Sequence, residues 1–100
     1  MATAQLTQQG EGRYAVSGEL SFATVTELLR QSRAQFAGES SMDVDLSGIT
    51  HADSAGLSLL IEWLRQARLQ NRQLRYLALP AQLQSLATIS DVAGLLTGEA

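Results

Sequence analysis

The residues best placed to do chemistry lie together at positions 51–54, where the chain reads His-Ala-Asp-Ser. A serine nucleophile, a histidine base and an orienting aspartate form the catalytic triad of many hydrolases. Such triads depend on three-dimensional geometry, and side chains this close together at a strand-to-helix junction rarely point at one another. Ser54 also lacks the G-x-S-x-G turn of α/β-hydrolases, and His51 is the only histidine. The pattern therefore disfavours hydrolysis.

A second group of polar residues, Asp43, Asp45 and Ser47, forms a D-x-D-x-[ST] string similar to that of Mg²⁺-dependent aspartate-nucleophile phosphatases. Those enzymes place both carboxylates after a buried strand and need a lysine elsewhere. Here the carboxylates alternate with apolar residues inside a predicted strand, the chain has no lysine, and two carboxylates are a small ligand set for Mg²⁺. The absence of cysteine excludes thiolate catalysis and cysteine-bound zinc. We expect no enzymatic activity, metal or cofactor.

A third interpretation is that Asp53 and Ser54 open a helix. Either side chain can act as N-cap and accept a backbone N–H of the first turn. Ala55 and Gly56 keep that turn small, so that another surface can approach its backbone. A phosphate on Ser54 would add a charge of about −1.5 to −2 at a position suited to anions. The stretch therefore predicts a structural cap, a regulatory switch, or both.

Strands and helices that alternate along the chain must position these residues. The turn 10–12 separates two strands, and the period-two alternation around 42–49 predicts a third. Phe22 opens the apolar face of the first helix, but Thr24 and Glu27 have the spacing of a capping box, which predicts an alternative helix start near Thr24. The predicted strands are 4–9, 13–17, 42–49 and 73–79, and the predicted helices are 22–37, 55–71 and 81–89, with 92–100 unassigned.

The order β-β-α-β-α-β-α predicts a small α/β sandwich in which three to four helices cover a mixed sheet, with residues 1–100 as one domain. Apolar residues make up 45% of the chain and charged residues 17%, which is typical of globular proteins. The net charge of −3 disfavours nucleic acid as a partner. The N-terminus has no signal-peptide pattern and no apolar run is long enough to span a membrane, so we expect no direct membrane insertion.

The predicted helix 55–71 carries apolar residues on two sides. On a wheel of about 100° per residue, Leu57, Leu60 and Leu64 mark the core side, whereas Leu59 and Trp63 project to nearly the opposite side. Because tryptophan is enriched at binding hot spots, an exposed Leu59–Trp63 pair predicts a partner surface. The alternative is that a neighbouring helix covers the pair. A polar strip also runs from Ser54 and consists of Ala55, Ser58 and Glu62.

Two motifs resemble those of the STAS domain, the family named after sulfate transporters and anti-sigma-factor antagonists. The first is Asp45-Leu46-Ser47-Gly48 followed, after a short loop, by Ala52-Asp53-Ser54-Ala55-Gly56-Leu57 at a helix start. The second is Val16-Ser17-Gly18-Glu19-Leu20, which is similar to the family's second strand. Element order and length agree over about the whole chain. The resemblance implies a STAS fold.

The resemblance implies two alternative functions. In anti-sigma-factor antagonists a partner kinase phosphorylates the serine after the aspartate, here Ser54, and the added charge weakens partner binding. A second branch of the family consists of small STAS subunits of the Mla phospholipid-transport ABC complexes of Gram-negative bacteria, which bind the side of the ATPase subunit. Leu59-Leu60-Ile61-Glu62-Trp63 resembles a stretch of that branch.

The branch resemblance favours a non-enzymatic cytoplasmic subunit, peripheral to the inner membrane through its partner. That partner would be an ABC-transporter ATPase in complex with a membrane permease, in a system that maintains outer-membrane lipid asymmetry. The alternative is an antagonist in a partner-switching cascade, with an anti-sigma-factor kinase as partner and Ser54 as the phosphorylation site. The expected partner-binding residues are Asp53, Ser54, Ala55, Ser58, Leu59, Glu62 and Trp63.

Overall fold

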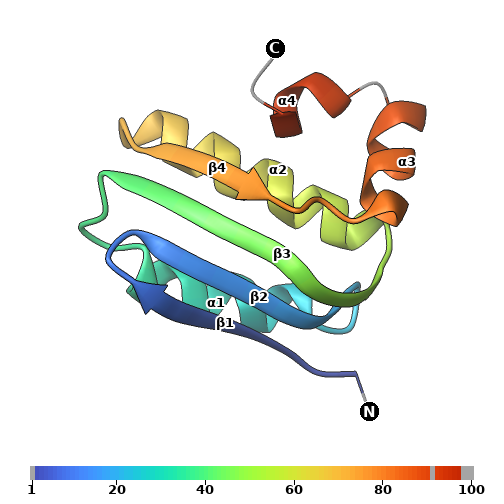
Figure 1. The fold of residues 1–100 in the computed structure, drawn as a ribbon, viewed down its shortest axis with the longest axis horizontal. Helices are drawn as coiled ribbons and strands as arrows, with labels where there is room; N and C mark the ends of the chain where they lie inside the picture. The colour runs from blue at the N-terminus through green and yellow to red at the C-terminus, as the bar shows by residue number, and fades with distance from the viewer. Residues whose placement is uncertain (1, 91, 98–100) are drawn as a thin grey trace.

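The computed structural model describes residues 2–90 and 92–97, which form a four-stranded sheet and four helices (Figure 1). The order of elements along the chain agrees with the predicted β-β-α-β-α-β-α and adds a short helix near the end of the chain. The strands are β1 (Ala4–Gly10), β2 (Arg13–Leu20), β3 (Ser41–Ala52) and β4 (Gln73–Leu77), and the helices are α1 (Val25–Gln35), α2 (Ser54–Leu69), α3 (Ala81–Ile89) and α4 (Ala93–Thr97).

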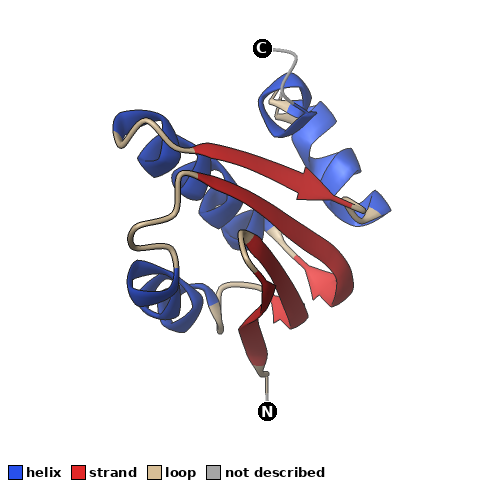
Figure 2. Cartoon of the chain, turned by 60° about the vertical axis from the view of Figure 1, so that its left-hand side comes forward, coloured by secondary structure: helices blue, strands red, loops and turns tan. Residues whose placement is uncertain are grey.

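The sheet is mixed and its spatial order follows the chain, β1-β2-β3-β4. The hairpin partners β1 and β2 run antiparallel, whereas β2–β3 and β3–β4 run parallel. Parallel neighbours require crossover connections, and α1 and α2 supply them. Both helices lie behind the sheet in Figure 1, and Figure 2 shows the same layers from another side. The predicted mixed α/β sandwich is confirmed.

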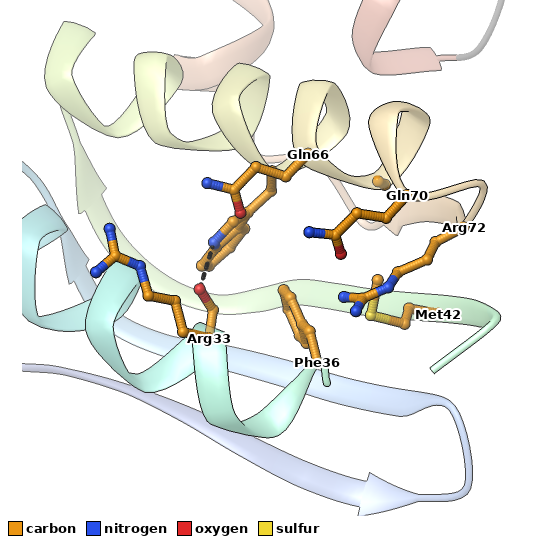
Figure 3. A pocket seen from close by; sticks show the side chains of 9 residues that line it. Arg33, Phe36, Met42, Gln66, Gln70 and Arg72 are labelled. Carbon is orange, nitrogen blue, oxygen red and sulfur yellow. Dashed lines mark hydrogen bonds between the residues drawn. The ribbon is translucent and has the colours of Figure 1, made fainter. Parts of the chain in front are cut away.

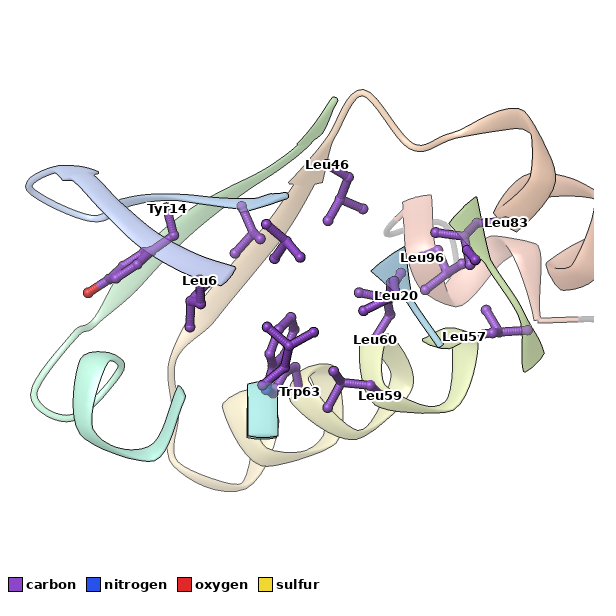
Figure 4. Packing of buried hydrophobic residues seen from close by; sticks show 14 of the residues in the cluster. Leu6, Tyr14, Leu20, Leu46, Leu57, Leu59, Leu60, Trp63, Leu83 and Leu96 are labelled. Atoms are coloured by element: carbon purple, nitrogen blue, oxygen red, sulfur yellow. The ribbon is translucent and has the colours of Figure 1, made fainter. Parts of the chain in front are cut away.

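The core lies between the sheet and the helices, because side chains alternate across each strand. Leu6, Val16 and Val44 are buried on the helix-facing side of their strands. α2 contributes Leu57 and Leu60 to the same cluster, part of which is shown in Figure 4. The other face of the sheet carries polar side chains, among them the exposed ion pair Arg75–Asp43 with 3.0 Å between Nη2 and Oδ2.

The predicted boundaries were too short for two strands, and the first helix begins at the later of its two predicted starts. β2 runs on through Gly18 to Leu20, and β3 runs on to Ala52. α1 begins at Val25, and Thr24 does not form the predicted capping box, because its hydroxyl oxygen accepts the backbone N–H of Ser21 at 3.0 Å while the hydroxyl donates to the Glu19 carbonyl oxygen at 2.6 Å. Residues 92–100, unassigned from the sequence, include α4 and then residues 98–100, which lie outside the described part.

These longer strands matter for the site because they end together. β2 and β3 pair as far as Leu20 and Ala52, so the loops that follow them leave the sheet side by side. The backbone N–H of Asp53 donates to the carbonyl oxygen of Leu20 at 3.2 Å and fixes this arrangement. Within the described residues, no helix is both long enough and apolar enough to cross a bilayer.

Candidate functional site

Of the two predicted capping residues, Asp53 and Ser54, Asp53 is the N-cap of α2. Its backbone is extended, and its Oδ1 accepts the backbone N–H groups of Ala55 and Gly56 at 2.9 and 3.1 Å. The first N–H groups of a helix have no partner within the helix, so this carboxylate satisfies two of them. Ser54 is therefore the first helical residue and not the cap. Its side chain is exposed, and its hydroxyl makes no hydrogen bond within the described part of the chain.

The second carboxylate oxygen of Asp53 reaches a different element. Oδ2 accepts the backbone N–H of Phe22, in the loop between β2 and α1, at 3.1 Å. Desolvation acts to raise the pKa of Asp53, but the N–H groups of Phe22, Gly56 and Ala55, together with His51, lower it by more, and the net pKa lies below its ordinary value. Asp53 is thus an anionic brace that joins the β2–α1 loop to the start of α2.

Gly56 is required by packing inside the molecule. A Cβ at this position would lie 2.2 Å from the carbonyl oxygen and 2.8 Å from Cγ of Leu20. The first turn of α2 therefore rests directly on the end of β2, and Gly56 is buried. The expectation that Gly56 lets a partner approach is wrong for this residue, because its open side is already filled by Leu20.

The outer side of the first turns of α2 forms the polar strip that the sequence predicted. Ser54 and Ser58 are exposed, and Ala55 and Glu62 are partly exposed. The Ser58 hydroxyl donates to the carbonyl oxygen of Ser54 at 3.0 Å. Glu62 Oε2 pairs with Nη2 of Arg65 at 2.7 Å, and this pairing lowers the pKa of Glu62 to about 2. The Ser54–Ala55 end of the strip carries only small side chains, whereas its far end carries the ion pair of Glu62 with Arg65.

Leu59 and Trp63 do not belong to that surface, and the predicted partner face built on them is wrong. Their exposed fractions are 4% and 1%. The Trp63 indole stacks edge-on against Phe36 with 5.5 Å between ring centroids, and its Nε1 donates to the hydroxyl of Ser32 at 2.9 Å. α1 covers this side of α2, as the alternative interpretation held. α2 buries two faces because it contacts both the sheet and a neighbouring helix. A helical wheel that assumes one buried side cannot show the second buried face.

Phe22 is the surface residue that the sequence analysis misplaced. It was expected on the inward face of the first helix, but it precedes α1 and its side chain is 84% exposed. Its backbone N–H is bonded to Asp53, so the loop that carries Phe22 lies beside the start of α2, although 31 positions separate the two residues in the sequence. The sequence signal that could have found it is the Glu19-Leu20-Ser21 run, in which the strand continues and leaves Phe22 in a loop.

The described residues also enclose a cavity of about 110 Å³ between α1 and α2 (Figure 3). Phe36 and Trp63 form its apolar side, and Arg33 and Arg72 lie at its rim. It sits near the C-terminal ends of the two helices, at the opposite end of α2 from Ser54. No group of three or more possible metal ligands occurs in the part of the chain that the structure describes. Asp53 and Ser54 lie away from this cavity, at the start of α2.

Comparison with known proteins identifies the family. The family described as "Mlab, STAS domain" matches residues 4–97, which is nearly the whole chain. The chain belongs to the MlaB-type STAS domains. A relative from Haemophilus influenzae, "Intermembrane phospholipid transport system binding protein MlaB", is 35% identical over 77 residues, and the match covers 72% of each chain.

Solved structures show the same STAS fold at lower sequence identity. The phosphorylated form of the Bacillus cell fate determinant SpoIIAA has a TM-score of 0.67 over 90% of this chain and 85% of its own, at 18% identity. Unphosphorylated SpoIIAA, an anti-sigma factor antagonist, has a TM-score of 0.65 over 87% of this chain and 83% of its own, also at 18% identity. The murine anion transporter Slc26a9 contains a similar region, with a TM-score of 0.62 and 18% identity, over 87% of this chain and 14% of the transporter.

Proposed function

We propose that this chain is a non-catalytic STAS subunit that binds, and regulates or stabilises, the ATPase of a phospholipid-transporting ABC complex. The ATPase would in turn hold the chain at the cytoplasmic side of the inner membrane, together with a permease. The observation that carries the proposal is the relationship to a phospholipid transport system binding protein, combined with an exposed Ser54 whose hydroxyl has no hydrogen-bond partner among the described residues. The docking surface would consist of Asp53, Ser54, Ala55, Ser58 and Glu62.

The geometry suits docking better than catalysis. Asp53 uses both carboxylate oxygens to hold backbone N–H groups, so it is not available as a general base. His51 lies at the end of β3 and is exposed, and no hydrogen bond joins it to Ser54 among the described residues. A serine without a base is a weak nucleophile. A rigid helix start with a small exposed residue is instead a surface that a partner can approach closely.

The proposal is tested by affinity capture from the inner-membrane fraction of the native host, with the tagged chain as bait and mass spectrometry as readout. The wild-type chain is expected to recover an ABC ATPase together with its permease. Ser54→Ala should recover them as well, because it keeps a small residue at the helix start. Ser54→Glu should lose them, because it places bulk and charge in the contact. Recovery of no ABC ATPase by the wild-type chain would refute the proposal.

A matched control separates a local effect from a general effect of charge. Ser40 is exposed and lies just before β3, at the opposite end of the sheet from Ser54. Ser40→Glu adds the same charge to the molecule, and we expect it to recover the ATPase as well as the wild-type chain does. Loss of binding in both glutamate variants would show that the surface around Ser54 is not the contact.

The second candidate function is a phosphorylation switch in a sigma-factor cascade, and the exposed, unpartnered hydroxyl of Ser54 favours it equally. Here the wild-type chain would recover a soluble serine kinase and carry phosphate on Ser54. Ser54→Ala would then lock the chain in its binding-competent form. If Ser54 serves only as a small residue in the contact, the same substitution should have a mild effect on binding. The two functions are thus distinguished by intact-mass measurement of the native chain and by the alanine variant.

A further inference from the structure

We propose that Phe22 is the hydrophobic anchor of the docking surface, and that it inserts into an apolar pocket with a basic rim on the ATPase. The inference rests on the proposed function and adds to it the loop between β2 and α1. Phe22 is 84% exposed, although a phenyl side chain gains more than most residues from burial. Single exposed apolar residues are common on protein surfaces, so exposure alone does not carry the inference. The further evidence comes from the surroundings of Phe22.

The loop that carries Phe22 is held in one conformation from both sides. Asp53 Oδ2 accepts the backbone N–H of Phe22 at 3.1 Å. A second hydrogen bond spans Phe22: the backbone N–H of Ser21 donates to the hydroxyl oxygen of Thr24 at 3.0 Å, and both of these residues are buried. An anchor that is already ordered loses little conformational freedom on binding, which favours affinity. The fold therefore fixes the backbone of Phe22 while leaving its ring in solvent.

Asp53 also places the backbone of Phe22 beside the start of α2. One carboxylate caps α2 with Oδ1 and holds Phe22 with Oδ2, so the anchor loop and the helix start form one rigid unit. A partner that contacts Ser54 meets Phe22 beside it. In Figure 1 the β2–α1 loop lies at the end of the sheet where β3 finishes and α2 begins. An exposed aromatic side chain beside the polar start of α2 is typical of a binding hot spot, in which one anchor residue is surrounded by polar contacts.

The charge around Phe22 indicates the chemistry of the partner. None of the seven arginines lies in residues 17–26, 47–58 or 79–90, which build this end of the molecule, whereas the carboxylates Glu19 and Asp53 and the exposed His51 do. Arg13, Arg33 and Arg68 lie toward the other end, where β2 starts and where α1 and α2 finish. An acidic surface around an aromatic anchor is complementary to an apolar pocket with basic residues at its rim. A second copy of this chain would meet it with a like-charged surface.

The experiment measures the affinity of purified variants for the ATPase subunit that the wild-type chain captures. Phe22→Ala is expected to weaken binding at least tenfold, as loss of an aromatic hot spot does, and Phe22→Leu should recover much of the affinity because it keeps an apolar side chain. Leu69→Ala is the matched control, since Leu69 is 69% exposed but is the last residue of α2, at the far end of that helix from Ser54. Thermal unfolding should be unchanged in all three variants, because each altered side chain is exposed.

The outcomes separate this inference from the function on which it rests. If the wild-type chain binds the ATPase and Phe22→Ala binds it equally well, the inference is wrong and the proposed function stands. If the wild-type chain binds no ATPase, both fall. A wild-type dimer that dissociates on Phe22→Ala would show that a second copy occupies the anchor and would overturn the inference. Binding that strengthens steeply with added salt would contradict the basic rim.

Discussion

Replacement of Gly56 by alanine tests whether the start of α2 is fixed by contact with β2. The new Cβ would stand 2.2 Å from the carbonyl oxygen of Leu20, whereas ordinary contacts of this kind begin at 3.4 Å. The first turn of α2 therefore has to move by about 1 Å, a distance that an interior packed like a crystal does not absorb without strain. The carbonyl is backbone and also accepts the N–H of Asp53, so it cannot turn away without loss of that hydrogen bond.

The magnitude follows from two opposed effects. Overpacking of a filled site typically costs about 1–3 kcal/mol, and the weakened hydrogen bond adds about 1 kcal/mol. Alanine is a better helix former than glycine by up to about 1 kcal/mol, and this gain acts in the opposite direction. We therefore expect Gly56→Ala to lower the free energy of unfolding by about 2 kcal/mol. If glycine served only to admit a partner, the same substitution would stabilise the isolated chain.

The assay is urea unfolding of the isolated chain, followed by circular dichroism. At an unfolding slope of about 1–3 kcal/mol per molar urea, a loss of 2 kcal/mol moves the midpoint down by about 0.7–2 M. Gly10→Ala is the control, since the nearest atom to a Cβ there is Cδ of Arg13 at 3.9 Å, and we expect its midpoint to match the wild type. A Gly56→Ala variant as stable as the wild-type chain would refute the packing argument.

Three further predictions concern side chains whose surroundings the structure defines. Trp63, the only tryptophan, should show blue-shifted fluorescence that resists acrylamide quenching, and Trp63→Phe should lower the free energy of unfolding by about 1–2 kcal/mol because it removes the hydrogen bond to Ser32. Asp53 has a lowered pKa, so its contribution to stability is fully present above the ordinary pKa and is lost as the pH falls through the lowered pKa. Asp53→Asn should therefore make the stability less dependent on pH in that acid range, as measured by thermal unfolding from pH 2 to 6. Burial and the neighbouring Glu39 raise the pKa of Tyr14 to about 12, and burial raises the pKa of Tyr76. Absorbance at 295 nm should therefore show no tyrosine ionisation near pH 10 unless the chain unfolds. The free energy of unfolding should fall as the pH rises above 10.

Much of the fold could be predicted from local patterns in the sequence. Met42, Val44 and Leu46 alternate with polar residues because β3 buries one face, and the alternation identified that strand. The turn at 11–12 and the start of α3 after Pro80 were likewise found from turn and cap residues. The ends of β2 and β3 were missed because their last residues are held by pairing between strands far apart in the sequence, which no local pattern records.

The candidate site was predicted in part, and the errors have a common cause. Asp53 and Ser54 were identified because capping chemistry is local to the helix start. Leu59, Trp63 and Phe22 were misassigned because their exposure depends on where α1 begins and which side of α2 it covers. α1 begins at Val25, which leaves Phe22 in the loop. α1 also packs on α2, so that Ser32 and Phe36 contact Trp63. The start of α1 thus decides the exposure of Phe22, and its packing on α2 decides the burial of Leu59 and Trp63.

The site also shows how a short signature can divide structural and functional tasks among neighbouring residues. Asp53 and Gly56 are explained by the fold itself, since one holds three backbone N–H groups and the other lets α2 rest on Leu20. Their presence therefore does not distinguish a transporter subunit from a phosphorylation switch. The Ser54 hydroxyl and the Phe22 ring contribute no such contact, so substitutions there should change binding and leave the unfolding midpoint in place. Variants at Asp53 and Gly56 should change both, and paired measurements of stability and affinity would assign each residue to its task.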